Sequence, residues 1–233
     1  MSTPSDDTAP ELSWEAAMRL LEKLPELPLT GRAEAIELLV RNPSPGIRER
    51  ALRLGAGLLS EDRLVEYIRN DDDAVLRNAG LEILKLRGTR SFQLAIRLLG
   101  DTNPDVVLQA VLVLDHLRDP RALEPLRAAL GDADLNVVQA AILAIGRLGN
   151  ARSTPDLLPF LATDPWLQMA AVQALGDLRS QRAIPALAGL LTDLVVGGMA
   201  AEAIARIGGT AAYRALAAQW LCHGERLDAE VVL

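Results

Sequence analysis

The sequence of 233 residues predicts an all-α fold, a solenoid of about seven antiparallel helix pairs with a period of about 30 residues. Two observations predict it. Half of the residues are apolar but only 3% are aromatic, so leucine, alanine, valine and isoleucine must form a core in which helices pack closely. One helical pattern also recurs along the chain, and internal repetition at roughly 20 to 50 residues is typical of solenoids.

The repeat is clearest when three segments are aligned on the mid-helix alanines Ala110, Ala141 and Ala171, which lie 31 and 30 residues apart. A leucine follows seven residues later in each segment, and an arginine eleven residues later. These columns are Leu117, Leu148 and Leu178, then Arg121, Arg152 and Arg182. Within a segment, apolar residues recur at i, i+4 and i+7, which is the stripe of an amphipathic helix rather than the alternation of a strand.

Helix starts are marked by a short polar residue followed by proline, as in Asn103-Pro104 and Asp164-Pro165. Such a side chain can cap free backbone N–H groups, and proline suits the first turn of a helix. Glycines such as Gly149 follow first helices and suit a left-handed C-terminal turn. First helices are predicted near 44–58, 72–87, 104–117, 134–148, 164–178 and 193–207. Second helices are predicted near 61–69, 90–99, 120–130, 153–161, 182–191 and 210–222.

The two ends of the chain depart from the repeat. Residues 1–10 are expected to be a disordered leader, and 11–41 a capping helix pair in which Thr30 caps the second helix. The repeat array is predicted to span 42–227. Residues 228–233 resemble the start of another first helix, cut in its second turn. We therefore expect further repeats C-terminal to residue 233, or a cap supplied by another molecule.

The columns resemble the short HEAT-like repeats named after the phycobilisome lyases. The segments Ala174-Leu175-Gly176-Asp177-Leu178 and Arg182-Ala183-Ile184-Pro185-Ala186-Leu187 carry the resemblance, which covers about residues 42–222. It implies the solenoid fold and almost nothing about activity, since adaptors, lyase subunits, hydroxylases and glycosylases share it. Leu76, Val107 and Val138 stand where the family usually has arginine, which argues against a regular Asp–Arg ladder between repeats.

Composition argues against several function classes. The 24 basic residues face 31 acidic ones, a net charge of −7, which disfavours nucleic-acid binding. A single cysteine, Cys222, and two histidines, His116 and His223, predict neither a metal site nor a cofactor, and no catalytic motif is found. No segment predicts a membrane span or a signal peptide, so we expect a cytoplasmic protein. Arginine supplies 22 of the basic residues, which is typical of a GC-rich bacterial genome.

Candidate binding residues come from the second helices, which usually line the concave face of such a solenoid. Positions expected to be exposed are polar in early units (Glu66, Gln93, Arg97, Glu124, Arg127) and small or apolar in later ones (Leu158, Pro159, Ala188, Gly189, Ala217, Ala218). The apolar part suits a partner helix or an extended peptide. The alternative is that these small residues let neighbouring repeats pack more tightly.

Two tryptophans are assigned different places. Trp166 stands in a column that is otherwise mostly small or polar, at the start of a first helix, so it is a candidate contact for a partner; otherwise it covers the preceding turn. Trp220 aligns with the buried end of a second helix and is predicted to lie in the core.

The function predicted from these residues is a non-catalytic protein-binding scaffold or adaptor that uses the concave face. One alternative is a bilin-lyase-type or chaperone-like subunit acting on a chromophore-bearing protein, and another is a structural spacer. The arginines Arg90, Arg121, Arg152 and Arg182 could form a row for an acidic peptide, or each could tie the turn between its helices to a nearby acid.

Overall fold

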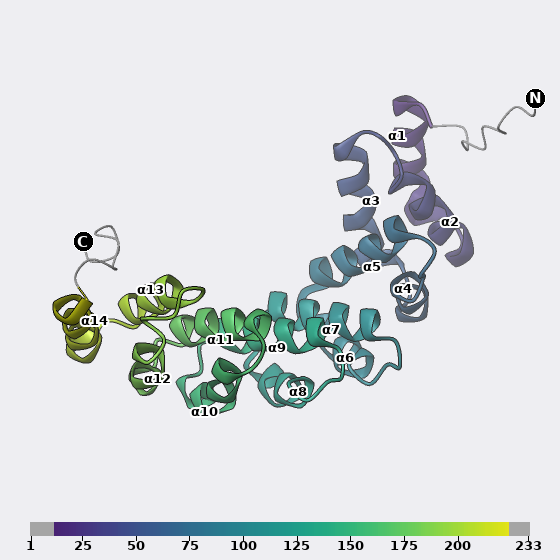
Figure 1. The fold of residues 1–233 in the computed structure, drawn as a ribbon. Coiled ribbons are helices and arrows are strands. Elements are labelled where there is room, and N and C mark those ends of the chain that lie inside the picture. The colour runs from purple at the N-terminus through teal and green to yellow at the C-terminus, as the bar shows by residue number, and fades with distance from the viewer. Residues whose placement is uncertain (1–11, 224–233) are drawn as a thin grey trace, which may run out of the picture. The chain divides into compact units, whose positions relative to one another are not determined.

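The computed structural model describes residues 12–223, and it is helical throughout, without a strand in that range. The segments 1–10 and 228–233, for which a leader and a truncated repeat are expected, lie outside it. The chain divides into two compact units, residues up to 94 and residues 95 onward. Each is a stack of antiparallel helix pairs (Figure 1), so the all-α solenoid is confirmed.

The first unit begins with the pair α1 (Trp14–Lys23) and α2 (Leu29–Leu39), continues with α3 (Pro45–Leu58) and α4 (Glu61–Ile68), and then contains α5 (Ala74–Arg87). α2 and α5 each pack on α3, and α4 packs on α5. The expected cap at Thr30 is wrong. α2 starts two residues earlier than a Thr30 cap requires, because its cap position is Pro28, whose side chain has no group to cap the helix.

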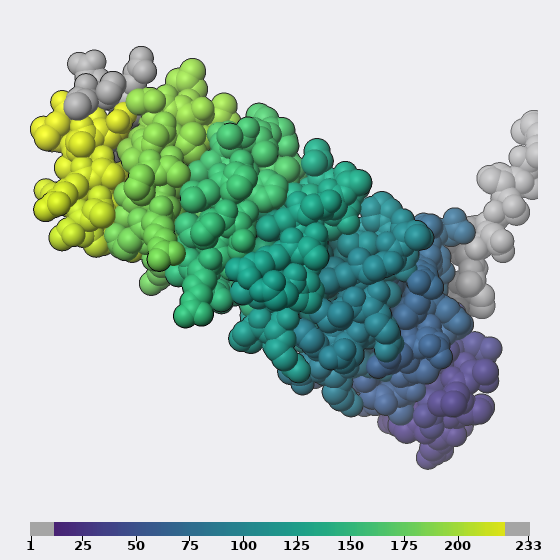
Figure 2. Space-filling view, turned by 90° about the horizontal axis from the view of Figure 1, so that it is seen from below, coloured from purple at the N-terminus to yellow at the C-terminus, as the bar shows by residue number. Residues whose placement is uncertain are grey.

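The second unit repeats one arrangement. Its first helices are α7 (Pro104–Leu117), α9 (Leu135–Leu148), α11 (Pro165–Asp177) and α13 (Gly197–Ile207), and each packs on the next. Its second helices are α8 (Leu123–Ala129), α10 (Thr154–Leu157) and α12 (Ile184–Ala188), followed by α14 (Gly209–His223); α6 (Phe92–Leu98) runs across the division between the units. In Figure 2 these residues, teal to yellow, form successive bands that border only their sequence neighbours.

The second helices differ from the continuous helices predicted for 120–130, 153–161 and 182–191. Each begins with a 3₁₀ turn, and the middle one also ends in 3₁₀ helix over Leu158–Ala162. Prolines at Pro155, Pro159 and Pro185 remove backbone donors inside these stretches and favour short pieces. α13 likewise begins at Gly197 rather than near 193, because Asp193 first closes a turn by accepting from the backbone N–H groups of Val195 and Val196.

The core follows the predicted stripes. Ala110, Ala141 and Ala171 are fully buried, and so are the residues four positions later, Leu114, Ile145 and Leu175. Leu76, Val107 and Val138 are also buried. Ion pairs between repeats form elsewhere instead: Arg147 contacts Asp115, and Arg206 contacts Asp177 at 2.5 Å.

Candidate functional site

The predicted second-helix residues lie at the surface with unequal exposure. Gln93, Arg97, Pro159 and Gly189 are exposed, whereas Leu158 and Ala188 are half-buried. Leu158 and Pro159 lie in the 3₁₀ segment that follows α10, and Ala188 is the last residue of α12. In the second unit these positions therefore present Pro159 and Gly189, and parts of Leu158 and Ala188, to solvent.

Arg127 links two second helices, and its positive charge is paired with acidic side chains. Its Nε donates to Asp156 Oδ2 at 2.7 Å, its Nη1 to Glu124, and its Nη2 to Ser153 Oγ at 3.4 Å. The hydrogen bond to Asp156 raises the pKa of Arg127. Because Asp156 belongs to α10 and Arg127 to α8, the contact fixes one second helix against the next, and the charge is already neutralised.

Trp166 is half exposed, with 50% of its surface accessible. It follows Pro165 at the start of α11, where Asp164 accepts from the backbone N–H groups of Trp166 and Leu167. Gln168 of α11 also donates to the carbonyl of Leu161 at 2.8 Å, which anchors the turn before the helix. The partial exposure expected for Trp166 is observed, and its role as a partner contact stays a prediction.

Trp166 has apolar neighbours in the equivalent places of adjacent repeats. Leu135 begins α9 and is 53% exposed, while Leu194 and Val195, in the turn before α13, are 96% and 65% exposed. Since α9, α11 and α13 pack side by side, these positions fall in a row. Sequence reasoning did not select these three residues; Val195 shares the mostly small or polar column of Trp166, whereas Leu135 and Leu194 stand one position earlier, in a column that is mostly proline and leucine.

We define the junction edge as residues 101–105, 132–136, 163–166 and 193–195, which lead from one repeat into the next first helix. It contains no lysine or arginine but six aspartates: Asp101, Asp105, Asp132, Asp134, Asp164 and Asp193. Several of them cap helix starts, and the backbone N–H groups of Val196 and Val195 lower the pKa of Asp193. The junction edge is thus both apolar and negatively charged at neutral pH.

Arginines outnumber acids at the ends of the first helices of the second unit and in the turns that follow them. These stretches contain seven arginines, of which Arg147 and Arg206 lie in the last turns of α9 and α13: Arg118, Arg121, Arg147, Arg152, Arg179, Arg182 and Arg206. The expected arginine row is exposed at Arg90, Arg121, Arg152 and Arg182, and Arg121 is held by Asp119 at 2.6 Å. That contact supports the turn-tying role for Arg121. The second unit therefore has acids gathered where repeats join and arginines where each repeat turns.

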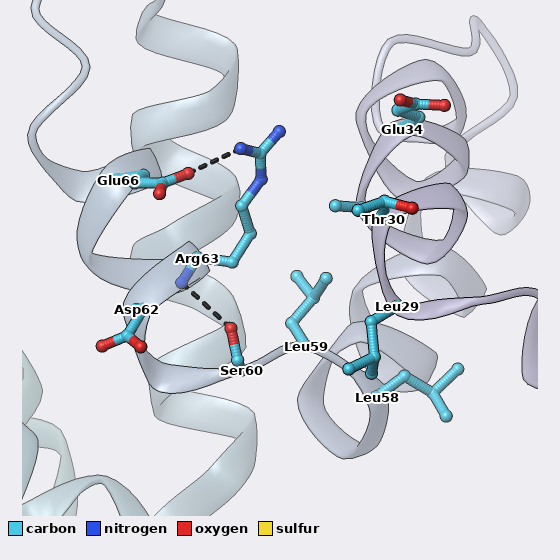
Figure 3. A pocket seen from close by; sticks show the side chains of 10 residues that line it. Leu29, Thr30, Glu34, Leu58, Leu59, Ser60, Asp62, Arg63 and Glu66 are labelled. Atoms are coloured by element: carbon cyan, nitrogen blue, oxygen red, sulfur yellow. Dashed lines mark hydrogen bonds and ion pairs between the residues drawn. The ribbon is translucent and has the colours of Figure 1, made fainter.

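The first unit holds a cleft of about 290 Å³ between α2 and α4 (Figure 3). Leu29, Leu58 and Leu59 lie at one end of it, and Glu34, Asp62 and Glu66 carry carboxylates around it. Arg63 projects from α4 and donates to Glu66 Oε2 at 2.5 Å and to Glu37. Among the cleft residues, the sequence analysis named Glu66 as an exposed polar position of a second helix and Thr30 as a helix cap.

Other predicted positions are partly corrected. Trp220 is wrong as a core residue, because it is 51% exposed on α14 and no described helix follows to cover it. His116 is exposed at the end of α7, as expected for a surface residue. Within residues 12–223, no three His, Cys, Asp or Glu side chains gather as metal ligands would. No helix in that range is long and apolar enough to cross a membrane.

Several solved structures are similar to this fold. A solved engineered protein from the Northeast Structural Genomics Consortium is similar to the chain with a TM-score of 0.52 and 17% identity, over 82% of this chain and 96% of that one. YibA of Escherichia coli is similar with a TM-score of 0.53 and 16% identity, over 83% and 81%. Human deoxyhypusine hydroxylase scores 0.36 at 19% identity, over 88% and 91%. At such identities the first two likenesses show the fold alone.

No curated protein matches the chain in sequence. The family model described as HEAT repeats matches residues 60–146, 93–167 and 154–226, which together cover most of the chain. That match is to HEAT repeats as a class, so the narrower resemblance to the phycobilisome-lyase type stays a prediction. The chain belongs to the HEAT-repeat family.

Proposed function

We propose that this protein is a non-catalytic scaffold or adaptor that binds another protein along the second unit, with the junction edge as the main contact and the second-helix face beside it. HEAT-repeat solenoids generally serve protein interaction, because stacked repeats present a long surface of little depth. The observation that carries the proposal is the row of exposed Leu135, Trp166, Leu194 and Val195. Large exposed apolar groups in a row mark interaction surfaces.

The partner's chemistry follows from the charge around that row. A helix or extended segment with apolar side chains would cover Trp166 and Leu194, and lysines or arginines beside them would face the aspartates of the junction edge. The same partner would then contact the second-helix residues Leu158, Pro159, Ala188 and Gly189, because they lie in the segments that lead into the junction edge.

Affinity capture from host lysate tests the proposal with four chains: wild type, Trp166→Glu, Leu194→Glu and Leu158→Glu. Leu86→Glu is the matched control, since Leu86 is a similarly exposed apolar residue of the first unit. We expect wild type and Leu86→Glu to recover the same partner, and Trp166→Glu and Leu194→Glu to lose it. Equal recovery by all variants, or no partner of the wild type, contradicts the proposed surface. Loss only with Leu158→Glu would move the contact to the second-helix face.

A further inference from the structure

We propose that the cleft between α2 and α4 is a second docking site, which takes a short peptide segment of a partner protein carrying a large aliphatic side chain next to a lysine or arginine. This site lies in the first unit and does not depend on the surface proposed for the second unit.

The cleft is held in shape before any partner arrives. Arg32 donates to the carbonyls of Leu27 and Pro25, both at 2.8 Å, and so fixes the turn that leads into Leu29. Arg87 donates to the carbonyl of Ala56 at 2.9 Å and to that of Leu59, which fixes the turn between α3 and α4. Ser60 accepts from the N–H of Arg63 at 3.2 Å and caps α4. Such preorganisation reduces the entropy lost on binding.

The apolar end of the cleft provides the anchor point. Leu29 is 70% exposed although it begins a helix whose other apolar residues are largely buried, and Leu58 beside it is half-buried. Ala33 and Thr30 on the facing side of α2 are short, which leaves the space open. A volume of about 290 Å³ lies at the lower end of ligand pockets, roughly 300–1,000 Å³. It has room for one large side chain and part of the next, not for a helix.

The charge of the cleft selects the neighbour of that anchor. Three carboxylates, Glu34, Asp62 and Glu66, line the cleft against one guanidinium, so the lining has a net charge of −2. The charge of the Arg63 guanidinium is already paired, because it contacts Glu66 and Glu37 and lies 5.4 Å from the ring centroid of Tyr67, while its buried Nε has no hydrogen-bond partner. Glu34 and Asp62 are exposed to solvent, so a basic side chain of a partner can reach their carboxylates. A lysine or arginine adjacent to the aliphatic anchor complements them.

The test is selection of a random 12-residue phage-displayed peptide library on the full chain, followed by fluorescence anisotropy with an enriched peptide. We expect enriched sequences that share Leu, Ile or Met next to Lys or Arg. Leu29→Glu should weaken binding by about tenfold or more, and Glu34→Lys by severalfold, since both residues contact the peptide. Leu86→Glu is the control for an exposed leucine outside the cleft, and it should bind as wild type does.

Circular dichroism and urea midpoints establish that the variants are folded; Glu34→Lys alters only an exposed rim residue, so it remains informative if Leu29→Glu unfolds. Trp166→Glu should retain the peptide, which separates this site from the surface of the second unit. The proposal is overturned if no sequence is enriched, if enriched peptides lack basic residues, or if they bind Glu34→Lys and Leu29→Glu as tightly as Leu86→Glu.

Discussion

A Cβ atom added to Gly146 of α9 would lie 2.6 Å from both the Cα and the Cβ of Ala174 in α11. Two successive first helices therefore touch where one of them has no side chain. The next pair repeats the relationship, because a Cβ on Gly176 would lie 3.0 Å from Ala203 of α13. Backbone contact of this kind leaves little room for adjustment, since both helices are buried along their shared face.

Gly146→Ala is therefore expected to destabilise the protein by about 1–3 kcal/mol, because the extra methyl group forces α9 and α11 apart. Urea unfolding followed by circular dichroism measures the loss. Gly198→Ala is the control: it lies in α13, and an added Cβ there meets nothing within 4 Å. It should leave stability unchanged or raise it slightly. Equal midpoints for the two variants would contradict the rigid contact.

The first helices could be predicted closely from sequence because their signals are local. Asn103, Asp134 and Asp164 each cap a helix through their side chains, and α7, α9 and α11 begin within a residue of the predicted start. The second helices were predicted less well. Their 3₁₀ segments arise from competition between i+3 and i+4 hydrogen bonds, which differ too little in energy for composition to decide.

The candidate site was only partly predictable for a different reason. Trp166 could be found because its column is otherwise small or polar, but exposure of Leu194 depends on the turn that Asp193 closes before α13. Trp220 matched a buried column, yet burial requires a following repeat to pack on it. The cleft at Leu29 depends on the spacing between α2 and α4. The repeat alignment does not include α2, so it could not predict this cleft.

We expect Asp73 to make the stability of the first unit sensitive to acid. It caps α5 through Val75 and Leu76 and contacts Arg41, and the hydrogen bond from Arg41 lowers the pKa of Asp73. The stabilisation is therefore complete above the ordinary aspartate pKa, near 3.9, and is lost as pH falls through the lower pKa of the folded state.

Asp73→Asn keeps a capping oxygen and removes the ion pair. We expect a loss of about 0.5 kcal/mol at pH 7 and a smaller further loss between pH 5 and about 2 than wild type shows. Urea midpoints across that range measure it, with the exposed Asp72→Asn as control. A variant that loses stability with acid as steeply as wild type would exclude Asp73 as a source of the dependence.

We expect Tyr67 to make the stability of the same unit sensitive to alkali. It is buried, and its hydroxyl donates to the carbonyl of Ala33 at 3.2 Å. Burial raises the pKa of Tyr67, because the phenolate would lose its hydration. The stabilisation is present below the ordinary tyrosine pKa, near 10, and is lost as pH rises from there towards the higher pKa of the folded state.

Tyr67→Phe removes the hydrogen bond and the titrating group together. We expect it to cost about 1 kcal/mol at pH 8 and to flatten the fall in stability above pH 10. Urea unfolding at pH 8 and above pH 10 measures the change in stability, with Tyr213→Phe as control because Tyr213 is exposed. If the alkaline loss persists undiminished in Tyr67→Phe, another group must cause it.

Arg127 and Asp156 should be coupled in stability. The 2.7 Å contact joins α8 to α10, and both side chains are 29% exposed, so the pair is neither fully screened nor fully desolvated. A double-mutant cycle with Arg127→Gln and Asp156→Asn is expected to give a coupling energy of about 0.5–1 kcal/mol, which decreases at high salt. A second cycle that combines Arg127→Gln with Glu124→Gln is the matched comparison within α8. Glu124 is 76% exposed, so its coupling energy with Arg127 should be smaller. Additive effects of Arg127→Gln and Asp156→Asn would show that Arg127 does not tie the repeats together, and its charge would then be available to a partner.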